Sequence, residues 1–293
     1  MFLLFGSNGW IGSKVVKLLE EKNIPFLKST NRADDITSIR KEIQSSQTPI
    51  THIMSFIGRT HGVYNNEKIT TIDYLEKPGK LVDNVRDNLY APVALALLCT
   101  ELNIHFTYLG TGCIFEYDET HPYGCEETGF HETSLPNFTG SSYSIVKGFT
   151  DQLMHQLPIL NVRIRMPITH EYNERNFITK ITNYKKVCSI PNSMTVLNEL
   201  LPCMIELSLR KEIGTVNLTN PGVISHNEIL EMYKEIVNPE FTWENFTQEE
   251  QNNILLSKRS NNCLDTHVLQ EFFPQVKHIR ESVLDMLLKM KLS

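Results

Sequence analysis

The chain lacks a block of basic residues. Its 28 Lys and Arg are outnumbered by 34 Asp and Glu, which gives a net charge of −6. A protein that follows a nucleic-acid backbone usually carries a basic patch, so nucleic-acid binding is not expected. Long apolar runs are also missing: residues 93–99 form one of the longest, whereas a membrane-spanning helix needs about 20 apolar residues. Neither a nucleic acid nor a membrane is therefore an expected partner.

Paired cysteines and a secretion signal are missing as well. The six cysteines form no CxxC pair and have no regular spacing, so we expect neither a disulfide framework nor a zinc site. No basic residue precedes the apolar start, which Gly6 interrupts at once, so no signal peptide is expected. A reduced, cytoplasmic compartment fits this cysteine usage. With 293 residues, 41% of them hydrophobic, the composition is that of an ordinary globular enzyme, and no metal cofactor is expected.

Short apolar runs alternate with longer helical patterns over the first 165 residues. We expect strands at residues 2–5, 25–28, 52–56, 106–109 and 159–164. Helices are expected around residues 15–19 and at 36–43, 82–102, 141–156 and, near the end of the chain, 278–291. Only Pro92 interrupts the helical pattern of residues 82–102. This alternation predicts a parallel sheet with right-handed crossovers, an α/β fold of the doubly wound Rossmann type.

Beyond residue 167 the pattern changes to mainly helices with short strands. Two capping boxes predict helix starts there, at residues 225–228 (Ser-x-x-Glu) and 247–250 (Thr-x-x-Glu). We therefore expect a dinucleotide-binding domain at residues 1–165 and a smaller, mainly helical substrate-binding lobe at 166–293. A later strand at residues 216–218 could return to the sheet.

A glycine-rich turn joins the first expected strand to the first helix, with the sequence Gly-Ser-Asn-Gly-Trp-Ile-Gly at residues 6–12. Glycines in this first turn allow backbone N–H groups to approach a pyrophosphate at the helix N-terminus. The alternative is a turn with a structural role only. The residues expected to bind the cofactor here are Gly6, Asn8, Gly9, Trp10, Ile11 and Gly12.

The second expected strand ends without an acidic residue. An NAD site would use such a residue to bind the ribose 2′-hydroxyl, but residues 28–32 read Lys-Ser-Thr-Asn-Arg and the first acid is Asp34. Arg32 could pair with a 2′-phosphate, so NADPH is the expected cofactor, with Asn31 beside it. Asp35 either neighbours the adenine or caps the helix at residues 36–43.

Tyr143 and Lys147 have the i,i+4 spacing that places two side chains on one helical face. A neighbouring ammonium is expected to lower the phenol pKa, and Tyr143 would donate a proton to a carbonyl oxygen as hydride arrives. Both residues are also expected to contact the cofactor. Thr111, after the fourth strand, would complete the constellation, or its hydroxyl bonds the backbone of a turn. Tyr64 and Lys68 share the spacing, but their polar, Asn-rich surroundings indicate a coincidence.

These features are typical of an extended short-chain dehydrogenase/reductase. Longer segments resemble the bifunctional nucleotide-rhamnose synthases (epimerase-reductases), which convert UDP-4-keto-6-deoxy-D-glucose to UDP-L-rhamnose. The segments are residues 6–12, TGCIFEYD at 111–118, PNFTG at 136–140, 143–147, RIRMP at 163–167, NFITKIT at 176–182, PNSMT at 191–195, NPGV at 220–223, SHNE at 225–228 and RSNN at 259–262. They extend over nearly the whole chain. A more distant resemblance is to dTDP-4-dehydrorhamnose reductase, which performs only the reduction.

The resemblance implies that Cys113 and Lys180 form the epimerase pair. In a 4-keto sugar the C3 and C5 hydrogens are acidic, and inversion needs one group to remove a proton and another to deliver one on the opposite face. A thiol beside cations can serve as the base. Which residue is the acid stays open. Without the resemblance, Cys113 would be interpreted as a buried small side chain and Lys180 as a solvated helix lysine.

The same region argues against a related reaction. Sugar-nucleotide 4,6-dehydratases resemble this fold but carry Thr-Asp-Glu after the fourth strand. Here the sequence is Thr111-Gly112-Cys113, so both carboxylates are missing. We therefore expect the chain to depend on a separate dehydratase for its nucleotide-sugar substrate.

The remaining substrate contacts are expected from polar side chains. The arginines expected at a diphosphate are Arg163, Arg175 and Arg259, of which Arg259 is the preferred candidate. Asn176 and Asn198 either contact the sugar or base or are capping and surface residues. Asn88 resembles the helix asparagine that organises the active site of related reductases.

Three functions fit the sequence. The first is a 3,5-epimerase and NADPH-dependent 4-reductase; the second is a reductase in which Cys113 is silent. The third is a catalytically idle, cofactor-binding regulatory subunit, against which the presence of Tyr143 and Lys147 argues. The sequence does not decide between UDP and dTDP, and a homodimer stays open.

Overall fold

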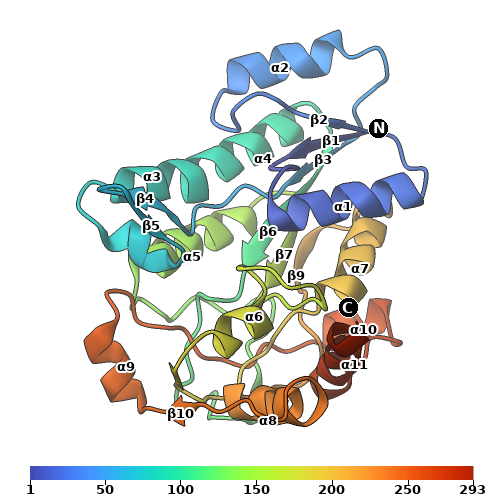
Figure 1. The fold of residues 1–293 in the computed structure, drawn as a ribbon. Helices are drawn as coiled ribbons and strands as arrows, with labels where there is room; N and C mark the ends of the chain where they lie inside the picture. Colours follow the sequence, from blue (N-terminus) through green and yellow to red (C-terminus); the bar gives the residue numbers. More distant parts are fainter. Residues whose placement is uncertain (293) are drawn as a thin grey trace. The chain divides into compact units, whose positions relative to one another are not determined.

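The structure is a computed structural model that describes residues 1–292. The structure contains a six-stranded sheet with the strand order β2-β1-β3-β6-β7-β9 (Figure 1). Its strands are β1 (Phe2–Phe5), β2 (Phe26–Lys28), β3 (His52–Ser55), β6 (His105–Thr111), β7 (Leu160–Ile164) and β9 (Gly214–Asn217). β2, β1, β3 and β6 pair in parallel. The prediction of a doubly wound Rossmann-type sheet is confirmed, and β9 supplies the strand expected at residues 216–218.

Helices cover both faces of this sheet. They include α1 (Trp10–Glu21), α2 (Ile36–Ser45), α3 (Leu81–Val85), α4 (Ala91–Glu101) and α5 (Ser142–Met154). Leu3 and Phe5 of β1 pack into a core with side chains of α2 and α4, and Figure 1 shows α1 on the opposite face. All four residues of β1 are buried, as expected for a parallel strand that is covered on both sides.

The helical stretch predicted at residues 82–102 is continuous but changes its winding. A π-helical turn, Arg86–Tyr90, joins α3 to α4, and Pro92 lies in the first turn of α4. Pro92 has no N–H for the carbonyl of Asn88, four residues earlier. The Thr150 hydroxyl of α5 donates to that carbonyl instead, at 2.6 Å. The predicted interruption at Pro92 is therefore a change of hydrogen-bond pattern rather than a break.

The contacts divide the chain into two compact units. The first comprises residues 1–114, 138–162 and 204–215, and the second comprises residues 115–137, 163–203 and the chain from Val216 onward. Each unit thus contains segments from both sides of residue 165, where we expected a single domain boundary. That boundary stays a prediction.

The first unit also contains a short hairpin of β4 (Gly62–Tyr64) and β5 (Glu67–Ile69), followed by the 3-10 helix Ile72–Glu76. The second unit is mainly helical. Its elements are the 3-10 helix Glu126–Thr128, α6 (Phe177–Thr182), β8 (Lys186–Val187), α8 (His226–Ile236), β10 (Glu244–Asn245), α9 (Gln248–Ile254), α10 (His267–Phe272) and α11 (Ile279–Leu292). One further helix, α7 (Leu197–Leu209), contributes residues to both units.

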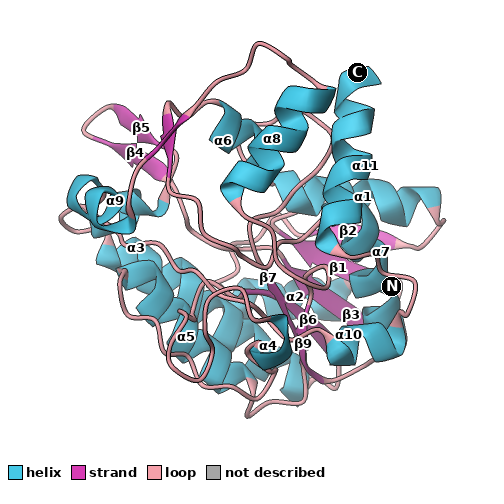
Figure 2. Cartoon of the chain, turned by 90° about the horizontal axis from the view of Figure 1, so that it is seen from below, coloured by secondary structure: helices cyan, strands magenta, loops and turns pink. Residues whose placement is uncertain are grey.

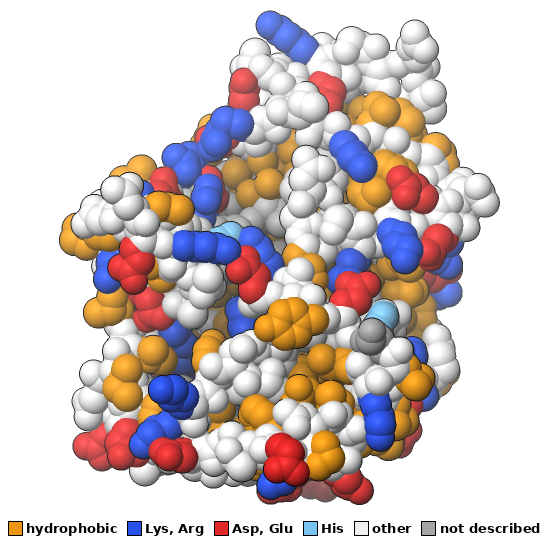
Figure 3. All heavy atoms as spheres, viewed as in Figure 1, with side chains coloured by type: hydrophobic (Ala, Val, Ile, Leu, Met, Phe, Trp, Pro, Cys, Tyr) orange, Lys and Arg blue, Asp and Glu red, His pale blue; other side chains and the backbone are white. Residues whose placement is uncertain are grey.

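Both capping boxes of the second unit are present, at Ser225 before α8 and at Thr247 before α9. α8 packs beside α11 (Figure 2), and their apolar faces share one core. Figure 3 shows basic and acidic side chains interspersed on the viewed face. Within residues 1–292, none of the helices has the length and apolar character that crossing a bilayer would demand.

Candidate active site

The glycine turn at residues 6–12 leads directly from β1 into α1. Gly6 has a φ of 74°, which favours glycine, and the Gly9 N–H donates to its carbonyl at 3.0 Å. A Cβ at Gly12 would lie only 2.2 Å from the Gly6 carbonyl oxygen, so no side chain fits there. Gly9 caps α1 without any side-chain hydrogen bond. This bare, closely packed helix N-terminus fits a dinucleotide pyrophosphate.

The polar residues after β2 are held by neighbours in the same unit. The Asn31 amide donates to Glu42 at 2.8 Å, and Arg32 forms a two-point pair with Asp34 at 2.9 and 3.1 Å. Asp35 accepts from the Ser38 N–H at 3.0 Å and caps α2, as the capping alternative predicts. The Arg32 side chain is 62% exposed, so a 2′-phosphate could reach it in exchange for Asp34.

Thr111 links two of the predicted catalytic residues. It ends β6, and its hydroxyl both hydrogen-bonds the Tyr143 phenol and accepts from the Cys113 N–H at 3.1 Å. The backbone hydrogen bond of the turn alternative is therefore present, and Thr111 also contacts Tyr143; a catalytic role of Thr111 stays a prediction. Tyr143 itself lies in the first turn of α5, whose N-cap Ser141 accepts from the Ser144 N–H.

The electrostatics of Tyr143 differ from the expectation. Burial raises the pKa of this phenol, the charge of a Cys113 thiolate raises it further, and the Thr111 hydrogen bond opposes both effects. The predicted lowering by Lys147 is wrong, because burial outweighs any stabilisation of tyrosinate. Tyr143 therefore stays protonated at neutral pH, which is the state that a proton donor needs.

Lys147 is directed to a residue that the sequence analysis missed. Its ammonium donates to the Tyr108 hydroxyl of β6 and lies 4.5 Å from the centroid of that ring. Burial lowers the pKa of Lys147 to about 8, and the carboxylate of Asp151, one turn further along α5, opposes this shift. A tyrosine within the strand expected at residues 106–109 was the available signal, because a buried phenol needs a partner.

Cys113 is half-buried and lies two residues beyond the end of β6. Its thiolate charge would raise the pKa of both Tyr143 and Lys147, so the sulfur lies close to the two side chains. The first unit thus brings together Thr111, Cys113, Tyr143 and Lys147. Cys113 is therefore not the buried small side chain that the alternative interpretation predicts. Cys99, by contrast, is fully buried.

Asn88 lies in the π-helical turn and is fully buried. Its side chain accepts from the Arg59 N–H and donates to the Arg59 carbonyl, both at 2.8 Å, and also donates to Asn84. π-helical turns frequently occur at functional sites. These contacts fix the loop after β3 against the helices, in agreement with an organising role.

Three cations converge in the second unit. Lys180 on α6 is half-buried, and burial, Arg175 and Arg259 lower its pKa in that order. It is therefore not a solvated helix lysine. Clustered cations favour an anion such as a diphosphate.

The predicted asparagines differ in their surroundings. Asn176 is fully buried and caps α6 through the Ile178 N–H, so the capping alternative describes it. Asn198 is exposed and lies 3.5 Å from the His170 ring nitrogen. Contact of either residue with a substrate stays a prediction.

The buried position of Arg163 favours a structural role over the predicted diphosphate contact. Its side chain is fully buried, stacks 5.1 Å from the Phe115 ring centroid and donates to the carbonyl of His131 at 3.2 Å. Arg175 and Arg259 remain the candidates for the diphosphate.

Tyr64 and Lys68 lie on the β4–β5 hairpin rather than on a helix. Tyr64 pairs with Glu67, and Lys68 pairs with Val63. Their i,i+4 spacing therefore creates no shared helical face, and the interpretation as a coincidence is confirmed.

Comparisons with known proteins identify the family of this chain. No family profile matches the chain. The mimivirus protein L780, from Acanthamoeba polyphaga mimivirus, is 51% identical over 99% of this chain and 98% of its own length. Its crystal structure, described as that of a UDP-rhamnose synthase, superposes with a TM-score of 0.92 over 99% of both chains. A bifunctional dTDP-4-dehydrorhamnose 3,5-epimerase/reductase of Arabidopsis thaliana is 43% identical over 97% of this chain and 91% of its own. The chain belongs to the nucleotide-rhamnose synthase family.

A more remote structure agrees in fold. The dTDP-4-dehydrorhamnose reductase of Bacillus anthracis, solved with NADP, has a TM-score of 0.77 at 16% identity and covers 98% of both chains. Membership of the rhamnose synthase family makes this chain an enzyme of the epimerase-reductase class.

Proposed function

We propose that this chain converts UDP-4-keto-6-deoxy-D-glucose to UDP-L-rhamnose by 3,5-epimerisation and NADPH-dependent reduction at C4. The observation that carries the proposal is the close grouping of Thr111, Cys113, Tyr143 and Lys147 at the end of β6 and the start of α5. A reductase requires the tyrosine and lysine, and only an epimerase also requires a base beside the ketone.

Epimerisation begins with removal of the C3 or C5 proton. The electron pair of the broken C–H bond moves into an enolate whose negative charge lies on the C4 oxygen, and the Tyr143 phenol stabilises that oxygen by a hydrogen bond. Cys113, as thiolate, takes the proton, and a second group returns a proton to the other face. Lys180, whose pKa is lowered by burial, is the predicted second group. Which of Cys113 and Lys180 removes the proton and which one returns it stays open.

Reduction uses the same C4 oxygen. NADPH, when bound, supplies a hydride to C4. The Tyr143 phenol then gives its proton to the oxygen, and the tyrosinate that remains regains a proton from solvent. Lys147 stabilises this transient tyrosinate while its ammonium is charged, that is, below a pH of about 8.

The proposed NADPH site consists of the glycine turn and the residues after β2. The turn leaves no room for a Cβ at Gly12, and the Nε1 of Trp10 is buried without a hydrogen-bond partner in the described chain. Arg32 is the proposed contact of the 2′-phosphate. NADP in the remote Bacillus anthracis reductase supports this choice of cofactor.

Arg175 and Arg259 are the proposed contacts of the nucleotide diphosphate, beside Lys180. We propose UDP rather than dTDP because L780, the relative at 51% identity, is described as a UDP-rhamnose synthase. Gly112 and Cys113 stand where a dehydratase carries its two carboxylates, so a separate 4,6-dehydratase would supply the substrate. All six cysteines are free thiols, which supports a cytoplasmic location.

One incubation tests the proposal. The protein is mixed with UDP-4-keto-6-deoxy-D-glucose and NADPH in heavy water, and the sugar is followed by NMR. We expect rhamnose with deuterium at C3 and C5 and one NADPH consumed per product. A reduced sugar without deuterium would indicate a reductase alone, and neither product nor exchange would indicate the idle regulatory subunit. The dTDP-linked substrate, in parallel, tests the choice of nucleotide.

A further inference from the structure

Two distant stretches of the second unit pair closely through their backbones. The Phe130 N–H donates to the Cys263 carbonyl at 2.8 Å, and the Asp265 N–H donates to the Phe130 carbonyl at 2.9 Å. A Cβ at Gly129 would lie 2.6 Å from the Asp265 nitrogen, so the two backbones meet as closely as glycine allows. The amide of Asn217 donates to the carbonyls of both Phe130 and Asp265 at 2.9 Å. The two backbone stretches are thereby held side by side.

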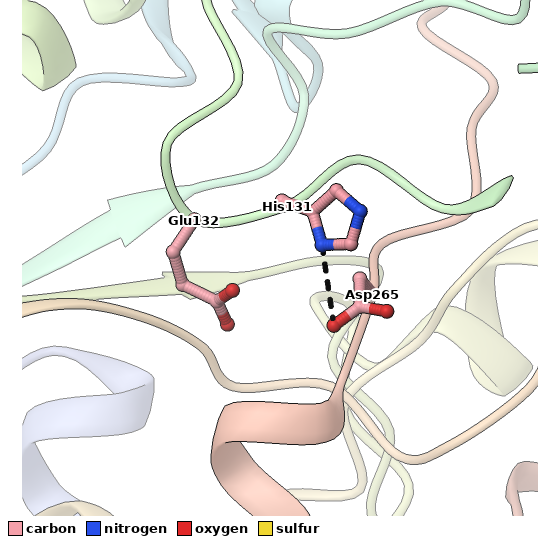
Figure 4. A group of neighbouring side chains, drawn as sticks. All are labelled: His131, Glu132 and Asp265. Atoms are coloured by element: carbon pink, nitrogen blue, oxygen red, sulfur yellow. Dashed lines mark ion pairs between the residues drawn. The ribbon is translucent and has the colours of Figure 1, made fainter. Parts of the chain in front are cut away.

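This pairing brings an imidazole and two carboxylates together. His131, Glu132 and Asp265 each offer a ligand atom, and these atoms all lie within 4.8 Å of one another. The His131 Nδ1 lies 3.7 Å from the Asp265 Oδ1, and Figure 4 shows this imidazole directed toward the Asp265 carboxylate. The group is thus assembled by the fold from two separate stretches of the chain.

The two carboxylates are buried close to each other. Glu132 is 9% exposed and Asp265 is 4% exposed. The Glu132 carboxylate accepts a hydrogen bond from the Asn217 N–H at 3.2 Å. His267 holds one oxygen of Asp265 through its Nδ1 at 2.6 Å. Two adjacent buried acids favour a further positive charge between them.

We propose that His131, Glu132 and Asp265 bind a divalent transition-metal ion, for which Zn²⁺ is the appropriate probe. One imidazole nitrogen and two carboxylate oxygens are ligands that Zn²⁺ accepts at about 2.0–2.2 Å, with water in a remaining position. Ca²⁺ and Mg²⁺ prefer oxygen ligands alone, so the histidine selects against them. The ligand atoms must move closer together around the ion, and the His131 side chain, which is 63% exposed, has the freedom to do so.

Such an ion would join residues 130–132 to residues 263–265 by metal bonds in addition to the backbone pairing. Its expected effect is therefore on the stability of the second unit, because metal binding to a folded site stabilises the folded state. His267 would act through Asp265 by orienting its carboxylate. The proposal is independent of the sugar-nucleotide chemistry.

The test uses the full chain, treated with a chelator, dialysed and titrated with Zn²⁺ by calorimetry. We expect one ion per chain in the wild type. His131→Ala and the isosteric Asp265→Asn should each weaken the affinity by about 100-fold or more. Co²⁺, added in place of Zn²⁺, should give visible absorption in the wild type that both variants lose. Circular dichroism checks that the variants are folded.

His278→Ala is the matched control. His278 also belongs to the second unit and lies 3.6 Å from a single carboxylate, that of Glu126. Its replacement should leave the Zn²⁺ affinity unchanged. The proposal is overturned if the wild type binds no Zn²⁺, or if His131→Ala and Asp265→Asn bind it as tightly as the wild type does.

Discussion

In the proposed mechanism, Tyr143 has two duties toward one oxygen atom. In epimerisation its phenol must hold the enolate oxygen without giving up the proton for good, and in reduction it must release that proton. Burial keeps the pKa of Tyr143 above its ordinary value, so the phenol enters both reactions protonated. The Thr111 hydroxyl, which favours tyrosinate, moderates this effect. The balance between burial and this hydrogen bond suits a residue that alternates between the two duties.

Tyr143→Phe separates the two reactions. Without the proton donor, the rate of NADPH oxidation should fall by about 10²–10⁴-fold. Exchange of solvent deuterium into C3 and C5 should persist at a reduced rate, because Cys113 still removes the proton while the enolate oxygen loses its hydrogen bond from Tyr143. Tyr64→Phe, on the β4–β5 hairpin, should change neither rate. If Tyr143→Phe oxidises NADPH at the wild-type rate, the assignment of the proton donor is wrong.

Tyr108 is expected to position Lys147 and to maintain its charge. The Tyr108 hydroxyl accepts a hydrogen bond from the ammonium, which stabilises the charged form, so Tyr108→Phe should lower the pKa of Lys147 from about 8. We expect the alkaline limb of the kcat/KM profile for reduction to move by about one pH unit toward lower pH.

Tyr74→Phe provides the comparison for this shift. Tyr74 is also a buried tyrosine of the first unit, but its hydroxyl bonds Asp83 at 2.9 Å rather than Lys147. This variant should leave the alkaline limb in place. A Tyr108→Phe enzyme that loses activity equally at every pH would indicate a structural role only.

Two elements present residues of the candidate active site, and each depends on a local backbone irregularity. At the N-terminus of α1 the glycine turn leaves the first N–H groups of the helix without a side-chain cap. At the junction of α3 and α4 the π-helical turn places Asn88 inward, and Pro92 leaves its carbonyl available to Thr150. Regular helices would offer neither feature.

Gly12→Ala tests the first of these elements. The added Cβ would meet the Gly6 carbonyl oxygen at 2.2 Å, so the turn must shift. We expect the Kd for NADPH, measured by fluorescence titration, to rise at least about tenfold, and the stability to fall by about 1–3 kcal/mol. Ser13→Ala, at the next and exposed position of α1, should change stability by less than about 0.5 kcal/mol. Wild-type NADPH affinity in Gly12→Ala would exclude the turn as the pyrophosphate site.

At the scale of the whole molecule, the periodic features were predictable from the sequence. Alternating apolar runs and helical patterns identified the first five strands of the sheet, and β9 was anticipated as a late strand. Such patterns reflect burial on one or two faces, which is a local property of the chain. The glycine turn and the Tyr–Lys spacing are local as well.

The features that the sequence could not predict depend on tertiary burial. The sign of the Tyr143 pKa shift follows from the burial of the phenol, which no spacing reveals. Arg163 was expected at the substrate, yet the fold encloses it beside Phe115. The same limit applies to Tyr108, whose contact with Lys147 joins residues 39 positions apart.

The central claim is that Cys113 and Tyr143 act on one ketone, and solvent exchange tests it most directly. Cys113→Ala and the control Cys125→Ala are incubated with UDP-4-keto-6-deoxy-D-glucose in heavy water, first without and then with NADPH. The account predicts that Cys113→Ala incorporates no deuterium at C3 and C5 while it still binds NADPH, and that Cys125→Ala behaves as the wild type. Deuterated rhamnose formed by Cys113→Ala at the wild-type rate would contradict it.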